Sequence, residues 1–289
     1  MLAGCSGLGV AMNAVPCSPG ERAVMTPVSP AWRPLPRPHP APAAPGTGPA
    51  PTLGDVTTVV LLRHGRTTAN TAGVLAGWTP GVQLDDTGLG QVQAVALRLS
   101  AVPLAAVVSS PLERCQQTAG AVVEERPLEL QTDDRFGEAR YGYWTGRPIK
   151  ELAKEPLWKV VQQHPSAAVF PGPEGEGLAQ TQARAVAAVR EWNAKLGPDA
   201  VWLACSHGDV IKAVLADAFG MHLDSFQRIV VDPASISVIT YTDTRPFVVR
   251  VNDTGGDVSA LVPPKKRPRR RRGGDSDAVV GGGAGAAAT

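Results

Sequence analysis

Residues 57–65 read TTVVLLRHG, and this stretch decides the fold. Its first six residues are apolar or β-branched on both faces, which is the pattern of a strand buried in a parallel sheet. The strand runs directly into His64. Residues 200–205 (AVWLAC) have the same buried pattern and are followed by SHGD, which contains His207. Because ligands bind beyond the carboxyl ends of strands in open α/β sheets, we expect both histidines to face one crevice.

Strand and helix patterns alternate around these two stretches. Further strands are predicted over 105–108, 235–241 and 247–251, and further helices after 85–87, from about 111, over 178–196 and over 210–219. In the helix after 85–87, apolar residues recur at helical spacing at Leu89, Val92, Ala96 and Leu99. Alternation with continuous apolar strands predicts an α/β fold, a three-layer α/β/α sandwich with a mostly parallel central sheet.

Both ends of the chain differ in composition from its middle. Residues 1–53 hold 12 of the 27 prolines, and because proline lacks an N–H and fixes φ, we expect a disordered arm there. Residues 257–289 contain PPKKRPRRRR and then a Gly/Ala-rich end, and we expect a disordered basic tail. The arm carries +2 and residues 263–289 carry +5, so a chain of net charge +2 leaves −5 on residues 54–262. Residues 54–256 are therefore the predicted folded domain.

Composition excludes several classes of protein. A hydrophobic share of 43% in 289 residues excludes wholesale disorder, and no apolar run approaches the ~18 residues of a membrane span. The four cysteines form no CxxC pair, which suits reduced thiols and a cytoplasmic location. For the basic tail, a weak contact with nucleic acid or another anion and a simply solvated segment are both open. Whether the chain forms a homo-oligomer is open as well.

Cations gather near the two histidines. Arg63 and Arg66 flank the first of them, and Arg114 lies near the start of the helix that follows the second strand. An arginine there offers a planar set of donors to a phosphate, aided by free N–H groups of the helix. The alternative for Arg114 is a surface salt bridge with Glu113 or Glu124. Together with the second histidine, Arg63 and Arg114 supply the positive charge that a phosphoryl group needs.

These motifs, in this order, closely resemble those of the histidine phosphatase superfamily, the phosphoglycerate-mutase-like proteins. The motifs are RHGRTTAN (63–70), LDDTGLGQ (84–91), SPLERCQQTA (110–119), GEARYGYWTG (137–146), PEGEG (173–177) and SHGD (206–209). The resemblance covers about residues 56–253 and extends to an actinobacterial subgroup usually labelled putative phosphomutase or phosphatase. It implies a phosphoglycerate-mutase-like sandwich.

The resemblance also implies a role for each site residue. His64 would be the nucleophile that becomes phosphohistidine, and Glu138 would be the proton donor. The phosphoryl oxygens would be bound by Arg63, Arg114 and His207. Further substrate contacts are expected at Asn70, Arg66, Thr67 and Gly208, with the extra cation of Arg66 near a distal acidic part of the substrate. Fixed Arg and His donors can stabilise the transition state without Mg²⁺, so we expect neither a metal nor a cofactor.

Two features depart from the family pattern or leave alternatives open. From the residues alone, Glu138 could equally be a surface carboxylate beside Arg135 or Arg140. The segment PEGEG differs from the usual Gly-Glu-Ser, and its residues 175–176 fit that pattern best, which puts a role for the usual serine in doubt.

The predicted function is hydrolysis of a phosphomonoester of a small metabolite through phosphohistidine, without a metal. His207 lies only 69 positions after Glu138, and the cations between 146 and 177 are scattered, with no paired arginines. Glycolytic mutases of the family carry a longer basic insertion there. A phosphoglycerate-mutase-type phosphomutase is therefore the alternative, and a non-catalytic phosphate-binding or regulatory protein is the second alternative.

Overall fold

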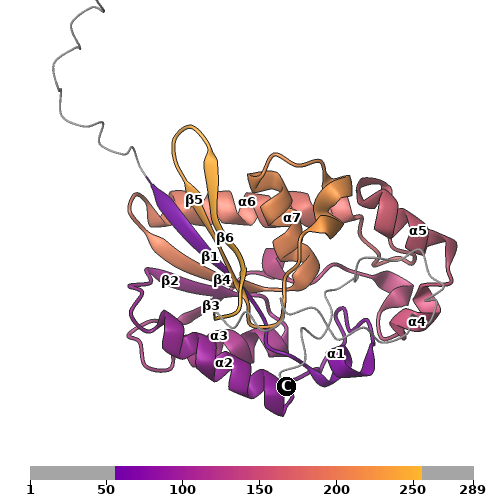
Figure 1. Cartoon of the computed structure of the whole chain (residues 1–289), viewed down its shortest axis with the longest axis horizontal. Coiled ribbons are helices and arrows are strands. Elements are labelled where there is room, and N and C mark those ends of the chain that lie inside the picture. Colours follow the sequence, from indigo (N-terminus) through magenta and orange to yellow (C-terminus); the bar gives the residue numbers. More distant parts are fainter. Residues whose placement is uncertain (1–55, 256–289) are drawn as a thin grey trace, which may run out of the picture. The chain divides into compact units, whose positions relative to one another are not determined.

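A computed structural model describes residues 56–255 of the chain (Figure 1). The arm predicted over 1–53 and the tail predicted over 257–289 lie outside the described residues. Within 56–255, no helix is both long enough and apolar enough to cross a membrane.

The central sheet has six strands in the order β3-β2-β4-β1-β5-β6. Their bounds are Thr57–Arg63 (β1), Ala106–Ser109 (β2), Leu130–Thr132 (β3), Val201–Ser206 (β4), Ile236–Tyr241 (β5) and Pro246–Asp253 (β6). The first four strands are mutually parallel, whereas β5 pairs antiparallel with both β1 and β6. The prediction of a mostly parallel sheet is confirmed.

The register between β1 and β4 places the two histidines. These strands are neighbours, and Arg63 at the end of β1 pairs with Ser206 at the end of β4. His64 and His207 are the next residues of the two strands. Parallel pairing in this register therefore brings residues 143 positions apart in the sequence to the same point of the sheet edge.

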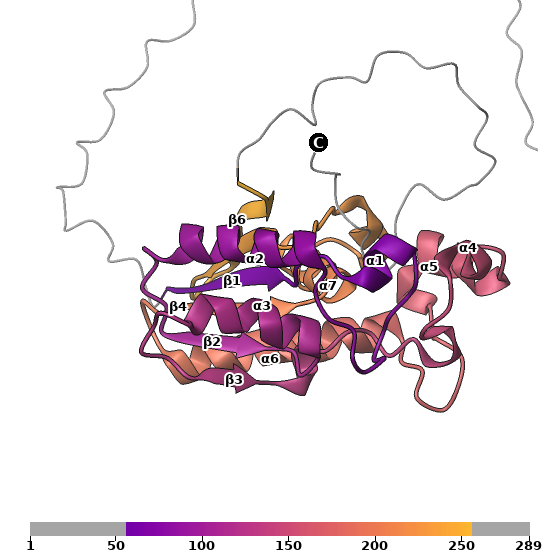
Figure 2. The same ribbon diagram turned by 90° about the horizontal axis from the view of Figure 1, so that it is seen from below.

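Helices cover both faces of the sheet (Figures 1 and 2). The helices are α2 (Asp86–Leu99) and α3 (Glu113–Val123) on one face, and α6 (Leu178–Leu196) and α7 (Gly208–Ala218) on the other. Because side chains of a strand alternate between faces, Val60 and Leu62 of β1 pack in the cluster with α2 and α3. Val59 and Leu61 pack in the cluster with α6 and α7. The three-layer sandwich is confirmed.

Helix α2 differs in detail from its sequence pattern. Of its apolar residues at helical spacing, Val92 and Leu99 are buried, but Leu89 is 47% exposed. The reason is the close approach of its first turn to the loop after β1, where a Cβ on Gly88 would lie 2.0 Å from the carbonyl oxygen of Arg66. Gly88 occupies the inward position in this turn and Leu89 points away from it.

Short elements lie beyond the carboxyl ends of the parallel strands, at the end toward which β1 points (Figures 1 and 2). They are α1 (Thr68–Ala72), α4 (Ile149–Leu152) and α5 (Pro156–Gln163). Four 3₁₀ turns complete the described elements, at Asp134–Phe136 (η1), Gly142–Trp144 (η2), Pro165–Ala167 (η3) and Leu223–Arg228 (η4). None of these elements was predicted from the sequence, and neither was β3.

Candidate active site

The two buried histidines face each other with their ring centroids 5.2 Å apart. Nδ1 of His64 lies 2.7 Å from the carbonyl oxygen of Gly65. A carbonyl only accepts hydrogen bonds, so this contact places the proton on Nδ1 and leaves the lone pair on Nε2. Within residues 56–255, Nε2 of His64 has no hydrogen-bond partner, whereas Nε2 of His207 is 2.8 Å from Oγ of Ser110. His64 is therefore the histidine with a nitrogen able to attack phosphorus.

Two buried arginines lie beside His64. Arg63 donates from Nη1 to the carbonyl oxygen of Val231 at 2.8 Å, and Arg114 donates from Nη2 to that of Gly77 at 2.9 Å. Nη1 of Arg114 is buried without a hydrogen-bond partner in the part of the chain that the structure describes. Burial, followed by the charges of Arg114 and Arg63, lowers the pKa of His64 well below its usual value. The imidazole of His64 is thus neutral, and Arg114 is buried rather than part of a surface ion pair.

Glu138 is buried rather than at the surface, and it lies beside the histidines. Its Oε1 accepts the N–H of Ala139 at 3.0 Å, and its Oε2 is 3.8 Å from Nδ1 of His207. Burial and then the charge of Asp209 raise the pKa of Glu138 to about 7, against the opposing charge of Arg114. A carboxyl with this pKa can both give and take a proton near neutral pH, as a general acid and base must.

A clamp of two charged residues, Arg184 and Glu176, holds the loop of Glu138. Arg184 donates to the backbone carbonyls of Arg135, Gly137 and Glu138. Its guanidinium also binds Glu176 through two hydrogen bonds, of 2.6 and 3.0 Å. Glu176, in the segment 173–177 that departs from the family pattern, therefore helps to fix the loop of Glu138 through Arg184. Sequence reasoning missed Arg184, because the hydrophobic pattern of the helix over 178–196 indicates only a polar residue at this position and no contact with Glu138.

A buried polar network continues behind Glu138. The hydroxyl of Tyr141 donates to Oδ2 of Asp209 at 3.0 Å, and Nζ of Lys212 lies 3.5 Å from Oδ1 of the same carboxylate. Asp209 and Lys212 are both at most 4% exposed. Sequence reasoning did not assign Asp209 a role, although an Asp and a Lys three residues apart in the apolar stretch of α7 are a signal of a buried ion pair.

This network predicts that Asp209→Asn lowers the pKa of Glu138, because it removes a charge that raises that pKa. The protonated carboxyl then persists only to a lower pH, so the alkaline limb of kcat/KM for an alkyl phosphate should move to lower pH. Asp217→Asn is the matched control on the same helix, since Asp217 pairs with Arg190 instead. An alkaline limb that stays in place in Asp209→Asn, as in the control, would refute this role.

The four predicted substrate-binding residues are close to the site, but some of their polar groups already form hydrogen bonds within the protein. Thr67 is the N-cap of α1 and forms a capping box with Asn70, whose Oδ1 accepts the N–H of Thr67 at 3.1 Å. The side-chain nitrogen of Asn70, Nδ2, is the group that remains to donate a hydrogen bond to a ligand. Arg66 donates from Nε to Asp85 at 2.8 Å, and Gly208 is the first residue of α7, directly after the second histidine. Their contacts with substrate stay predictions.

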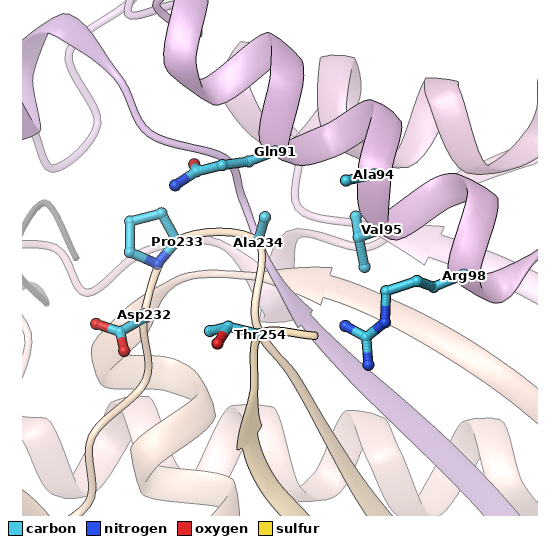
Figure 3. A pocket seen from close by; sticks show the side chains of 8 residues that line it. All are labelled: Gln91, Ala94, Val95, Arg98, Asp232, Pro233, Ala234 and Thr254. Atoms are coloured by element: carbon cyan, nitrogen blue, oxygen red, sulfur yellow. The ribbon is translucent and has the colours of Figure 1, made fainter. Parts of the chain in front are cut away.

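A hollow of about 220 Å³ lies on the α2 side of the loop 232–234 (Figure 3). It is lined by Gln91, Ala94, Val95, Arg98, Asp232, Pro233, Ala234 and Thr254. Its two charged side chains are already bound, Arg98 to Asp253 and Asp232 to Asn252. This hollow contains none of the predicted site residues and is not the candidate active site.

A buried, neutral histidine, two buried arginines and a carboxyl of pKa about 7 at the edge of an α/β sheet define a phosphoryl-transfer enzyme. The family model described as the histidine phosphatase superfamily (branch 1) matches residues 59–254. The chain belongs to this superfamily, and it is an enzyme. Its chemistry is phosphohistidine-mediated transfer from phosphomonoesters. The likeness to the actinobacterial subgroup stays a prediction.

Some proteins similar to this chain are named as phosphatases and others as mutases. Phosphoserine phosphatase 1 of Hydrogenobacter thermophilus is 29% identical over 204 residues, which are 68% of this chain and 92% of that protein. A probable phosphoglycerate mutase GpmB of Yersinia pestis is 29% identical over 208 residues, covering 70% and 94%. The solved structure of Bacillus stearothermophilus YhfR has a TM-score of 0.63 at 26% identity, over 68% of this chain and 97% of that one. The phosphoglycerate-mutase-like fold is confirmed.

Proposed function

We propose that the protein hydrolyses phosphomonoesters of small metabolites, with His64 as the nucleophile and Glu138 as the proton donor. The observation that carries this proposal is the 2.7 Å contact between Nδ1 of His64 and the carbonyl oxygen of Gly65, which leaves the lone pair on Nε2, in a site that also contains the buried Arg63 and Arg114. Fixed cations supply the charge stabilisation that a phosphoryl group in transfer requires.

In the first step, Nε2 of His64 forms a bond to phosphorus while the ester P–O bond breaks. The departing oxygen takes the proton of Glu138, so an alcohol leaves rather than an alkoxide. Negative charge on the equatorial oxygens is stabilised by Arg63, Arg114 and His207. The pKa of His207 is lowered by burial and by Arg114, and a bound phosphoryl dianion opposes both effects.

In the second step, the carboxylate of Glu138 takes a proton from a water molecule whose oxygen bonds to phosphorus. The P–N bond breaks, inorganic phosphate leaves, and Nε2 of His64 regains its lone pair. One residue can serve both steps because a pKa of about 7 makes both protonation states accessible near neutral pH.

Hydrolysis is favoured over phosphomutase activity by the segment 146–177. Its elements α4 and α5 are short, and Arg147 is bound to Glu155 at 2.5 Å. Its lysines and its histidine are exposed: Lys150, Lys154, Lys159 and His164. A mutase must protect phosphohistidine from water, and no cation of this segment is buried in a position to close the site.

We expect 3-phosphoglycerate to release inorganic phosphate, with no acceleration by a bisphosphoglycerate primer and less than about twofold inhibition by EDTA. The reason is that buried arginines, not a metal, supply the positive charge. Phosphate release and isomerisation are measured in the same samples. Rapid primer-dependent isomerisation with negligible phosphate release would show a mutase instead, and strong inhibition by EDTA would contradict the metal-independent mechanism.

The proposal extends to the cellular compartment of the enzyme, its partners and its first candidate substrates. Cys115 and Cys205 are buried free thiols, which supports a reducing compartment, and we place the enzyme in the cytoplasm. Formation of a homo-oligomer stays a prediction. A weak anion or nucleic-acid contact of residues 257–289 stays one as well, and those residues lie outside the described ones. The names of the relatives make phosphoserine and phosphoglycerate the first substrates to test.

A further inference from the structure

A second hollow, of about 300 Å³, opens between the loop of Glu138 and the loop after α1. Its lining combines one aromatic ring, two opposite charges and two hydroxyls, contributed by Trp78, Thr79, Pro80, Arg140, Gly142, Thr145 and Glu174. A small pocket with an apolar wall and a few polar groups is typical of a ligand site.

Two hydrogen bonds and one short separation in sequence tie this hollow to the reaction centre. The indole N–H of Trp78 donates to the backbone carbonyl of Glu138 at 2.7 Å. Gly77, the residue before it, accepts the hydrogen bond of Arg114, and Arg140 follows Glu138 by two residues. The hollow therefore lies on the Glu138 side of the site. A proton donor must reach the leaving oxygen, so the part of the substrate that departs extends to this side.

Arg140 is preorganised in the hollow. Its guanidinium lies 4.1 Å from the centroid of the Trp78 ring, and its backbone N–H is fixed by Glu176 at 2.9 Å. Among the residues that the structure describes, no carboxylate forms an ion pair with this exposed guanidinium. Stacking uses the face of the guanidinium and leaves its edge donors for a planar anion. Arg66, the cation expected to serve a distal acidic group, is bound to Asp85 through its Nε, and its contact with substrate stays a prediction.

Resting on the proposed function, we propose that Arg140, stacked on Trp78, binds a carboxylate of the leaving group, so that the substrates are phosphomonoesters of small hydroxy acids. Glu174 and the two threonine hydroxyls line the rest of the hollow. They offer acceptors to an amino or hydroxyl group beside that carboxylate. Arg140 is thereby a specificity-determining residue, and the phosphoryl group is handled by other side chains.

The test compares substrates with and without the carboxylate. Phosphoserine is compared with phosphoethanolamine, in which a hydrogen replaces the carboxylate, and 3-phosphoglycerate with glycerol 3-phosphate, in which a hydroxymethyl group replaces it. In each pair the wild type should show a kcat/KM about 10–100-fold higher for the acid, the range expected for a hydrogen bond between charged groups. In Arg140→Ala this ratio should fall to about one. In Arg140→Glu, the carboxylate-free member of each pair should become the better substrate. Arg190→Ala, a surface arginine bound to Asp217, is the control and should leave the ratio and the rates unchanged.

The outcomes separate this proposal from the one it rests on. A wild-type ratio near one, or an unchanged ratio in Arg140→Ala, overturns the role of Arg140 while hydrolysis of p-nitrophenyl phosphate still stands. Loss of the ratio in Arg140→Ala, with the Arg190→Ala ratio intact, supports it. A merely structural effect would lower both members of a pair alike. Hydrolysis of p-nitrophenyl phosphate that survives in His64→Ala would overturn the proposed function instead.

Discussion

His64→Ala is expected to lower kcat/KM for every phosphomonoester by at least about 10⁴-fold, because the variant cannot form a covalent intermediate. The other histidine does not replace it. Nε2 of His207 is engaged by Ser110, and its Nδ1 faces Glu138. Initial rates of phosphate release from p-nitrophenyl phosphate and phosphoserine measure the loss.

The intermediate itself gives a second measurement. Wild-type enzyme quenched into base after mixing with a phosphorus-labelled substrate should carry label that is stable to base and released by acid, as expected for a phosphoramidate. His64→Ala should carry none. His222→Ala removes an exposed histidine that pairs with Asp224, and it should match the wild type in rate and labelling. Residual label in His64→Ala would mean that another residue is the nucleophile.

The juxtaposition of His64 and His207 could be predicted from the sequence because it depends on two local signals. The apolar patterns of β1 and β4 end directly in His64 and His207, and parallel pairing brings strand ends together. Helix α6 was predicted with its observed bounds, Leu178–Leu196, because Gly197 and a proline end it. Elements with strong local signals of this kind can be predicted from the sequence because they depend little on distant contacts.

The surroundings of Glu138 could not be predicted, because each contact joins segments that the sequence keeps apart. Trp78 reaches the Glu138 carbonyl from 60 residues away, and Arg184 reaches it from 46 residues away. Helices α1 and α4 have five and four residues, too few to be stable without tertiary contacts, so their local sequence carries little signal. Burial, followed by the charge of Asp209, raises the pKa of Glu138, and both causes arise only in the folded chain.

Glu138→Gln should separate the two proton transfers. For an alkyl phosphate such as phosphoserine, the leaving oxygen needs a proton, and we expect kcat/KM to fall by about 10²–10⁴-fold. For p-nitrophenyl phosphate the leaving group departs unprotonated, so His64 is still phosphorylated, whereas the attacking water has lost its base. Phosphoenzyme should then accumulate, with a burst of nitrophenol before a slow steady state. Glu191→Gln, at a surface glutamate bound to Arg135, is the control and should show neither effect.

The pH profile of Glu138→Gln tests the same assignment independently. The pKa of Glu138 is raised to about 7, so the carboxyl is protonated below that pH and loses its proton above it. Wild-type kcat/KM for phosphoserine should therefore fall about tenfold per pH unit on the alkaline side, and this limb should be missing in Glu138→Gln. Ionisation of the substrate affects both enzymes equally and cancels in the comparison. If the variant kept the wild-type alkaline limb, the titrating proton donor would be another group, and the buried carboxyl beside His207 would have to be assigned only to positioning.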